Sequence, residues 1–408
     1  MQKSMKSIPK LIIILNLAFT GCSKSSIDNA WELYKKSDFN SALKATNRLY
    51  SDSSHHLRGN IFQLMGNYDK ALNNYNSIDS SYRDFQQILI SKMNILFHHK
   101  KNIIKAKEVS KKVLNKESKI FITSLEKTMK LVSKGTFSVP MERSHPLNNY
   151  IPHVKAKING SELNIAFDTG ANYLIMSKAQ SEKLNLKYNE NNYFYGQQGF
   201  SKSKMWISSA NNFTIGNSLN FTNVPVVILE EINTDIIIFG TSIIKEMLTT
   251  IDYPNQQFVF TSLNDKNLIK SHRLKYSGKT MPFTMWGDHY MMGNGLFNEK
   301  KINMFFDSGL VVVGVVDGDI KQSWMCMTPE NMKILGVLNP DSTSVTKITP
   351  TTHSISFAGN NHGNVLLSKS ITEFEFGGVK CDLLISHGVI KNYAWTLDFE
   401  KMLYTFSL

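Results

Sequence analysis

The pattern of apolar and polar positions divides the chain into two parts of different character. Residues 28–134 contain few Pro and Gly residues and many helix-favouring ones, which predicts an α-helical region. From about residue 146 onward, short apolar runs alternate with Gly- and Asn-containing turns, as in β-strands. Gly135 and Pro140 interrupt the helical pattern between the two parts, so we predict a linker over residues 135–145.

The helical part repeats a short motif. An aromatic residue in a short turn is followed three positions later by a small residue, Ala42 in the first copy and Ala71 in the second. A third copy places Ala106 at the corresponding point, so the alanines recur at intervals of 29 and 35 residues. The motif resembles tetratricopeptide repeats, whose period is about 34 residues. We predict a tetratricopeptide-like array over residues 23–134, with an unrelated helical bundle as the alternative.

The β-rich part contains the same succession of features twice. A strand–turn–strand unit ends in "NIAFDTG" at Asp168, and a second one ends in "NMFFDSG" at Asp307. Each is followed by an apolar strand and then by a short helix, which Ser177 or Thr328 would cap. A single Asp can open a turn, but two at equivalent points of a duplicated unit are difficult to explain by turn chemistry.

The ends of the two units align without a gap. Residues 239–260 and 385–406 share Ile, Lys, Thr, Asp and Phe at corresponding positions. We therefore predict two related lobes, residues 146–265 and 266–408, in a pseudo-twofold arrangement.

The net charge of +13 is concentrated in the N-terminal part. Residues 23–134 hold 20 Lys and Arg against 10 Asp and Glu, whereas residues 135–408 hold 23 of each kind. Four lysines make the end of the helical region basic: Lys111, Lys112, Lys116 and Lys119. We interpret them first as a solvated face, and second as a docking surface for an acidic protein partner or acidic lipid headgroups.

Residues 1–22 have the layout of a secretory signal, with three Lys, an apolar run too short to span a bilayer, and small residues. "FTGC", ending at Cys22, resembles the lipobox of bacterial lipoproteins, although Phe19 stands where Leu is usual. The resemblance implies that Cys22 is acylated, and Ser23 is similar to residues that direct sorting to the outer membrane. We expect a lipid-anchored protein of the bacterial cell envelope, facing the periplasm, without a nucleic-acid partner. Ordinary cleaved secretion is the alternative.

The paired Asp-Thr/Ser-Gly turns, each with a later apolar strand that ends at Gly or Ser, resemble aspartic proteases of the retropepsin and pepsin type. The resemblance covers about residues 146–408, and the short lobes are closer to two fused retropepsin-like units than to pepsin. It implies a bilobal β-rich fold in which the two turns meet, with Asp168 and Asp307 as the catalytic pair. The predicted fold class is thus multidomain, α plus all-β.

Two facing carboxylates can act as an acid and a base at the same pH. At about 4 Å and an effective dielectric of 20, two unit charges repel by about 4 kcal/mol, so the pair shares one proton. The ionised carboxylate can take a proton from a water that attacks a peptide carbonyl, while its partner protonates the carbonyl oxygen. This chemistry requires no metal, cofactor or covalent intermediate.

The resemblance also assigns supporting residues. The hydroxyls and the close backbone approach at the two turns would hold the pair rigid, through Thr169, Gly170, Ser308 and Gly309. "YFYGQQGF" resembles the flap that closes over substrate, with Tyr195 and Gly196 as substrate-binding residues; a plain hairpin is the alternative.

Several positions depart from the family pattern or leave alternatives open. Ala171 and Leu310 follow the two Gly residues and offer no hydroxyl to the carboxylates, which predicts a mildly acidic to near-neutral optimum. The bulk of Leu310, and Ser386 in place of a Gly, put full activity in question. A disulfide between Cys326 and Cys381 is left open.

No His/Cys group has zinc-ligand spacing, and the pairs His55-His56 and His98-His99 are expected to be solvated. Taken together, the sequence predicts a membrane-anchored aspartic endopeptidase that acts on peptides or proteins, with a helical region for docking. The alternatives are an inactive peptide-binding or scaffold lipoprotein and a partner-binding lipoprotein that works through its helices. Because fused lobes need no dimerisation to build the site, we expect a monomer.

Overall fold

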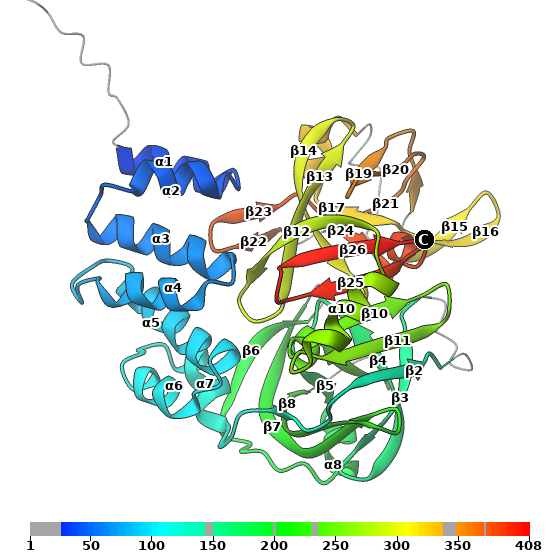
Figure 1. Cartoon of the computed structure of the whole chain (residues 1–408), viewed down its shortest axis with the longest axis horizontal. Helices are drawn as coiled ribbons and strands as arrows, with labels where there is room; N and C mark the ends of the chain where they lie inside the picture. The colour runs from blue at the N-terminus through cyan, green and yellow to red at the C-terminus, as the bar shows by residue number, and fades with distance from the viewer. Residues whose placement is uncertain (1–25, 143–149, 199–200, 231–235, 338–347, 371–372) are drawn as a thin grey trace, which may run out of the picture.

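The computed structural model describes residues 26–142, 150–198, 201–230, 236–337, 348–370 and 373–408. The predicted signal segment and Cys22 lie outside these residues. Among the described residues, no helix has both the length and the apolar character needed to cross a membrane. A helical region is followed by a β-rich region, as predicted (Figure 1).

The helical region consists of short helices that follow one another along the array. They are α1 (Ser26–Lys35), α2 (Phe39–Thr46), α3 (Asp52–Leu64), α4 (Tyr68–Asn76), α5 (Phe85–Asn94), the π-helical turn η1 (Ile95–His99), α6 (Ile103–Ser110) and α7 (Lys116–Ser124).

The repeated sequence motif has a repeated local structure. The side chains of Asp38, Asn67 and Asn102 cap α2, α4 and α6 by accepting a hydrogen bond from the backbone N–H three residues later. The repeated alanine is the fourth residue of each of these helices and is fully buried, which lets neighbouring helices approach closely. The tetratricopeptide-like identity of the array stays a prediction.

The first lobe is built on an eight-stranded sheet with the order β1-β8-β5-β9-β4-β3-β7-β6. Its elements are β1 (Lys130–Leu131), β3 (His153–Ile158), β4 (Ser161–Asp168), β5 (Leu174–Ser177), α8 (Lys178–Lys183), β6 (Tyr193–Gln198), β7 (Ser201–Ile215), β8 (Leu219–Leu229), β9 (Ile237–Gly240) and α9 (Thr241–Ile244).

The second lobe belongs to a 14-stranded sheet, whose main path is β18-β21-β17-β24-β14-β13-β12-β26-β25-β10-β11-β2. The sheet also includes three strands from before residue 266, which are β2 (Thr136–Pro140), β10 (Met247–Asp252) and β11 (Gln257–Ser262). Its strands from the second lobe are β12 (Lys279–Trp286), β13 (Tyr290–Phe297), β14 (Lys300–Asp307), β17 (Met325–Met327), β18 (Thr349–Pro350), β19 (Ile355–Phe357), β20 (Asn360–His362), β21 (Leu366–Lys369), β24 (Leu383–Ser386), β25 (Ala394–Asp398) and β26 (Leu403–Ser407). The second lobe also contains two separate hairpins, β15 (Val313–Val316) with β16 (Asp319–Gln322) and β22 (Phe374–Phe376) with β23 (Val379–Cys381). Its helices are α10 (Lys266–Lys275), α11 (Pro329–Leu335) and α12 (His387–Ile390).

The duplication seen in the sequence is present in the strand pairing. β4 lies parallel to β9 with Asp168 opposite Gly240, and β14 lies parallel to β24 with Asp307 opposite Ser386. β5 and β17 then pair with their neighbours in the same way in both lobes.

The ends of the two units meet in a shared layer. β10 pairs with β25 so that Thr250 lies opposite Thr396, and their hydroxyl oxygens are 2.6 Å apart. These two threonines occupy corresponding positions in the aligned sequences. Residues 136–140, within the segment predicted as a linker, form β2 and extend this layer beside β11. That segment is therefore not a free connection, because its backbone is paired in the sheet.

The helical region packs against both lobes (Figure 1). Ala30 and Tyr34 on α1 share a buried apolar cluster with Trp286 and Phe305 of the second lobe. The Tyr34 hydroxyl also donates a hydrogen bond to the Gly377 carbonyl oxygen (2.9 Å). At its other end, the array shares a cluster with β7 and β8 of the first lobe. The helices thus bridge the lobes instead of extending away from them.

This packing overturns the expectation that the histidine pairs are solvated. His56 is 8% exposed and His98 is 7% exposed. The His98 ring lies against Phe121 and Tyr173, with its Nδ1 atom 2.9 Å from the Tyr173 hydroxyl oxygen. The expectation was wrong because His98 is covered by the first lobe and α7, whereas His56 is covered by Trp31 and Tyr82 within the helical region.

Candidate active site

The two Asp-Thr/Ser-Gly turns interlock at the boundary between the lobes. The Thr169 N–H donates to the Ser308 hydroxyl oxygen (3.0 Å), and the Ser308 N–H donates to the Thr169 hydroxyl oxygen (2.9 Å). Each hydroxyl in turn donates to a carbonyl oxygen of the opposite turn, Thr169 to Phe306 (2.6 Å) and Ser308 to Phe167 (3.2 Å). Both side chains are fully buried, so four internal hydrogen bonds fix the turns relative to each other.

The carboxylates of Asp168 and Asp307 face the same space. A Cβ atom added at Gly170 would lie 3.0 Å from one oxygen of Asp307 and 3.1 Å from one oxygen of Asp168. A Cβ atom at Gly309 would collide with the Asp168 carboxylate, so glycine is required there. The N–H groups of Gly170 (2.7 Å) and Gly309 (3.0 Å) donate to the carboxylate of their own turn.

Burial raises the pKa of both carboxyls, and the negative charge of Asp168 raises the pKa of Asp307 well above its usual value as well. The hydrogen bonds from the glycine N–H groups act in the opposite direction but do not cancel these effects. The pair therefore holds one proton to a higher pH than an exposed Asp would.

We expect the pH profile of peptide cleavage to reflect these raised pKa values. The working form carries one proton on the pair, and raised pKa values move the loss of that proton to higher pH. The optimum should therefore lie above about pH 4, where an exposed Asp is already ionised. The measurement is kcat/KM against pH with a single peptide substrate. An optimum below about pH 3.5 would contradict this assignment.

A cavity of about 620 Å³ opens beside Asp168. Tyr195 and Gly196 of β6 line it, on the hairpin predicted as the flap. The tip of that hairpin lies outside the described residues, and the role of these two residues stays a prediction. Apolar side chains from the first lobe form much of the wall: Ile175, Phe194, Met205, Val227, Leu229 and Ile238. Such a wall suits an apolar substrate side chain.

Part of the same cavity wall comes from outside the first lobe and was not found by sequence reasoning. The helical region supplies Asn94, Glu117, Ser118 and Phe121, and the turn between β12 and β13 supplies His289 and Tyr290. Nothing in the local sequence of α5 or α7 signals this position, because it follows from how the array packs on the lobes.

Asp288 holds the β12–β13 turn beside the cavity. Its carboxylate lies 2.7 Å from His289 Nδ1 and 3.6 Å from His98 Nδ1, and Lys245 Nζ donates to its backbone carbonyl (2.7 Å). Burial is the largest single influence and opposes ionisation of Asp288, but the basic groups around the carboxylate, His289 foremost, together outweigh it and hold the Asp288 pKa well below the usual value. Burial also lowers the pKa of His98 to about 3, which leaves that ring neutral. The network joins the helices and both lobes next to the dyad.

The structure answers the two departures noted in the sequence. At Gly240, an added Cβ would collide with the backbone of Ala171, whereas Ser386 is accommodated in the second lobe. The Ser386 hydroxyl donates to the Ser323 carbonyl and accepts from the Gly388 N–H (3.0 Å). Leu310 packs against two apolar clusters and does not line the cavity beside Asp168. Neither residue displaces the carboxylates.

Cys326 and Cys381 are both free and buried, so the disulfide that the sequence left open does not form. Burial raises the pKa of the Cys326 thiol to about 11, which keeps it protonated. Among the residues that the structure describes, no cluster of His, Cys, Asp or Glu could hold a metal ion.

Residues 154–246 match the family of gag-polyprotein putative aspartyl proteases. The matched segment runs from β3 to just beyond α9 and includes Asp168 and the predicted flap hairpin. This part of the first lobe is therefore similar to an aspartic protease family, in agreement with the resemblance seen in its motifs.

A crystal structure of a retropepsin-like aspartic protease from Rickettsia conorii is 18% identical to this chain, with a TM-score of 0.23. The match covers 33% of this chain and 92% of that chain. With a TM-score this low, the likeness supports no conclusion about this chain. No curated protein matches it.

Proposed function

We propose that this protein is an aspartic endopeptidase in which Asp168 and Asp307 activate water together. The observation that carries the proposal is the pair of interlocked turns, which directs both carboxylates into one space beside an apolar cavity. One carboxylate takes a proton from the attacking water, and the other, protonated, donates to the peptide carbonyl oxygen. The raised pKa values support the shared proton on which this division depends.

The direct test is an assay of the full mature chain with a peptide library and a denatured protein across a range of pH. The full chain is needed because the helical region packs on both lobes and lines the cavity. Cleavage that pepstatin-type inhibitors block would support the proposal. Binding of peptides without cleavage at any pH would instead favour the inactive peptide-binding scaffold.

We propose further that acylation of Cys22 anchors the protein in the cell envelope, facing the periplasm, as the lipobox-like segment implies. The helical region then lies between the anchor and the protease lobes. Incorporation of labelled fatty acid into the wild type but not into Cys22→Ser would support the anchor. Equal labelling of both would contradict it.

We expect Glu117 to influence which substrates are cleaved. It lies in the first turn of α7 on the cavity wall, its side chain is exposed, and no ion pair engages it among the described residues. Its charge should favour a basic residue at one substrate position. Glu117→Lys should lower kcat/KM by about fivefold for a peptide with Lys at that position and raise it by about fivefold for a peptide with Glu there. Effects of this size are typical of partly exposed ion pairs.

The measurement is the ratio of kcat/KM for two peptides that differ only at that position. Glu126→Lys is the matched control, because Glu126 is exposed just beyond α7 and does not line the cavity. If the ratio of kcat/KM for the Lys peptide to that for the Glu peptide is the same in Glu117→Lys as in this control, the assigned role of Glu117 is ruled out.

A further inference from the structure

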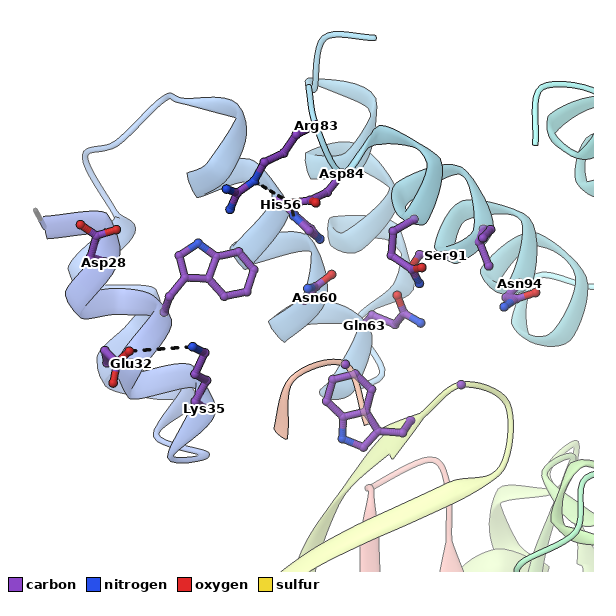
Figure 2. A pocket seen from close by; sticks show the side chains of 16 residues that line it. Asp28, Glu32, Lys35, His56, Asn60, Gln63, Arg83, Asp84, Ser91 and Asn94 are labelled. Carbon is purple, nitrogen blue, oxygen red and sulfur yellow. Dashed lines mark hydrogen bonds and ion pairs between the residues drawn. The ribbon is translucent and has the colours of Figure 1, made fainter. Parts of the chain in front are cut away.

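A second and larger cavity, of about 710 Å³, lies under the helical array (Figure 2). Helices α1, α3 and α5 form its sides, and the end of β12 with the β22–β23 turn closes it from the second lobe.

The charges on these walls are largely paired with each other. Lys35 lies 3.9 Å from Glu32, and Arg83 lies 3.3 Å from Asp84. His56 lies 3.8 Å from the same Asp84 carboxylate. A lining without a marked excess of positive charge does not suit a phosphate or another strongly anionic ligand.

Carboxamide side chains dominate the rest of the polar lining. Figure 2 shows Asn60, Gln63 and Asn94 along one stretch of the wall. The Tyr75 hydroxyl lies 2.7 Å from Asn60 Oδ1 and 2.9 Å from Gln63 Oε1, which orients both groups. A carboxamide offers a donor and an acceptor, and this combination matches the N–H and C=O groups of an extended peptide backbone.

The Trp286 indole forms part of the cavity wall on the side of the second lobe. Trp286 is 9% exposed, and its Nε1–H has no hydrogen-bond partner among the described residues. Buried donors are nearly always paired in folded proteins. This nitrogen is enclosed by the protein, so a ligand in the cavity would contact the indole ring and not its N–H.

This helical cavity adjoins the cavity beside the dyad. Asn94 lines both of them. On the opposite side, one β12–β13 turn contributes Trp286 and Gly287 to the helical cavity, and His289 and Tyr290 to the dyad cavity. The Asp288 network fixes this turn between the two cavities, so their relative position is set before any ligand binds.

We propose that the helical cavity is a second binding site for the same polypeptide substrate whose scissile bond lies at the dyad. The substrate chain passes Asn94 between the two cavities, and carboxamide groups bind its backbone away from the cleaved bond. The substrate class is therefore an extended, unfolded polypeptide longer than the dyad cavity alone accommodates. This inference rests on the proposed peptidase function and adds the helical region to its substrate site.

Two substrates test the proposal on the full chain. One is a peptide of about six residues, roughly 20 Å long when extended, that the wild type cleaves. The other carries the same residues with about ten more on each side. The variants are Gln87→Ala, which removes an exposed carboxamide from the helical cavity, and Gln87→Trp, which obstructs it. Asn73→Ala is the matched control, because Asn73 is exposed on α4 and lines neither cavity.

The wild type should cleave the long peptide with the lower KM. Gln87→Ala should raise that KM by about fivefold, the value of one hydrogen bond, and Gln87→Trp should raise it further. The short peptide and the control variant should show no change. Equal KM values for the two peptides, or equal effects of Gln87→Trp on both, would overturn the proposal.

The outcome is separable from that of the proposed function. If the wild type cleaves the short peptide but shows no dependence on length, only the second site is refuted. If it cleaves neither peptide, the dissociation constant of the fluorescently labelled long peptide still tests the cavity. In that case Gln87→Trp should weaken binding by at least about fivefold relative to Asn73→Ala, and equal binding would refute the second site.

Discussion

Replacement of either dyad carboxyl by a carboxamide should reduce kcat/KM for peptide cleavage by about a thousandfold or more, while the fold stays intact. Asn cannot take a proton from water or share one with the remaining Asp, and proton transfer of this kind contributes about 10² to 10⁴ in rate. The measurement compares Asp168→Asn and Asp307→Asn with the wild type at the pH optimum. Asp317→Asn is the matched control, because Asp317 lies in the exposed β15–β16 turn at a positive φ that Asn tolerates.

The same replacement should increase stability at neutral pH. Because the folded-state pKa of Asp307 is raised, the folded protein binds this proton more tightly than the unfolded chain does. The resulting stability is fully present below the unfolded pKa of about 4 and is lost as the pH rises toward the folded pKa. Asn carries no charge at any pH, so Asp307→Asn should unfold at a higher temperature than the wild type near pH 7, with a difference that shrinks toward pH 4.

Thermal unfolding of the two proteins at several pH values tests this sign. A wild type that is more stable than Asp307→Asn at pH 7, together with full activity of the variant, would mean that the two carboxyls do not form a proton-sharing pair. If Asp307→Asn loses both its activity and its fold, seen as a changed circular dichroism spectrum, the stability of Asp168→Asn is compared with that of the wild type instead.

The second large effect is expected from Thr169→Val, which keeps the shape of the side chain but replaces its hydroxyl with a methyl group. The change removes the donor to Phe306 and the acceptor for the Ser308 N–H, and both of these groups are left buried. Leaving buried polar groups unpaired costs about 1–3 kcal/mol each, so we expect a loss of roughly 2–4 kcal/mol in unfolding free energy. The activity should fall as well, because the dyad loses its alignment.

Thr249→Val is the matched control for this substitution. Thr249 is fully buried, but its hydroxyl has no hydrogen-bond partner among the described residues, so its replacement leaves no new unpaired group and should not destabilise the protein. Chemical denaturation and kcat measured side by side distinguish the two positions. Equal stability of both variants would show that the interlocking hydroxyl does not hold the lobes together.

The features that the sequence predicted well depend on local or repeated patterns. The two Asp turns could be found because each ends an apolar strand and is followed by the same succession of elements. The alignment of residues 239–260 with residues 385–406 predicted two related lobes, and in the structure the aligned Thr250 and Thr396 lie directly opposite each other. The repeated alanines could be found in the same way, and in the structure Ala42 and Ala71 are fully buried in equivalent helices.

The features that the sequence did not reveal depend on contacts between distant segments. His98 was expected in solvent, because a helical pattern does not show whether another part of the chain covers its face. Glu117 and Phe121 gave no sign that they lie on the wall of the dyad cavity. In the sequence, Ser386 put full activity in question because it replaces a Gly. In the structure, its hydroxyl is hydrogen-bonded to the Ser323 carbonyl and the Gly388 N–H.

By itself, then, the sequence determined the chemistry of the candidate site, because two equivalent Asp-Thr/Ser-Gly turns in a duplicated unit specify which side chains must meet. Only the tertiary structure decided the surroundings of that site. The contact between Tyr34 and Gly377 joins residues 343 positions apart and helps place the helical region against the second lobe. Burial free energy depends on which surfaces cover each other. The spacing of apolar residues predicts that a helix face is covered but not by which segment, so the helical wall and the second cavity appeared only in the folded chain.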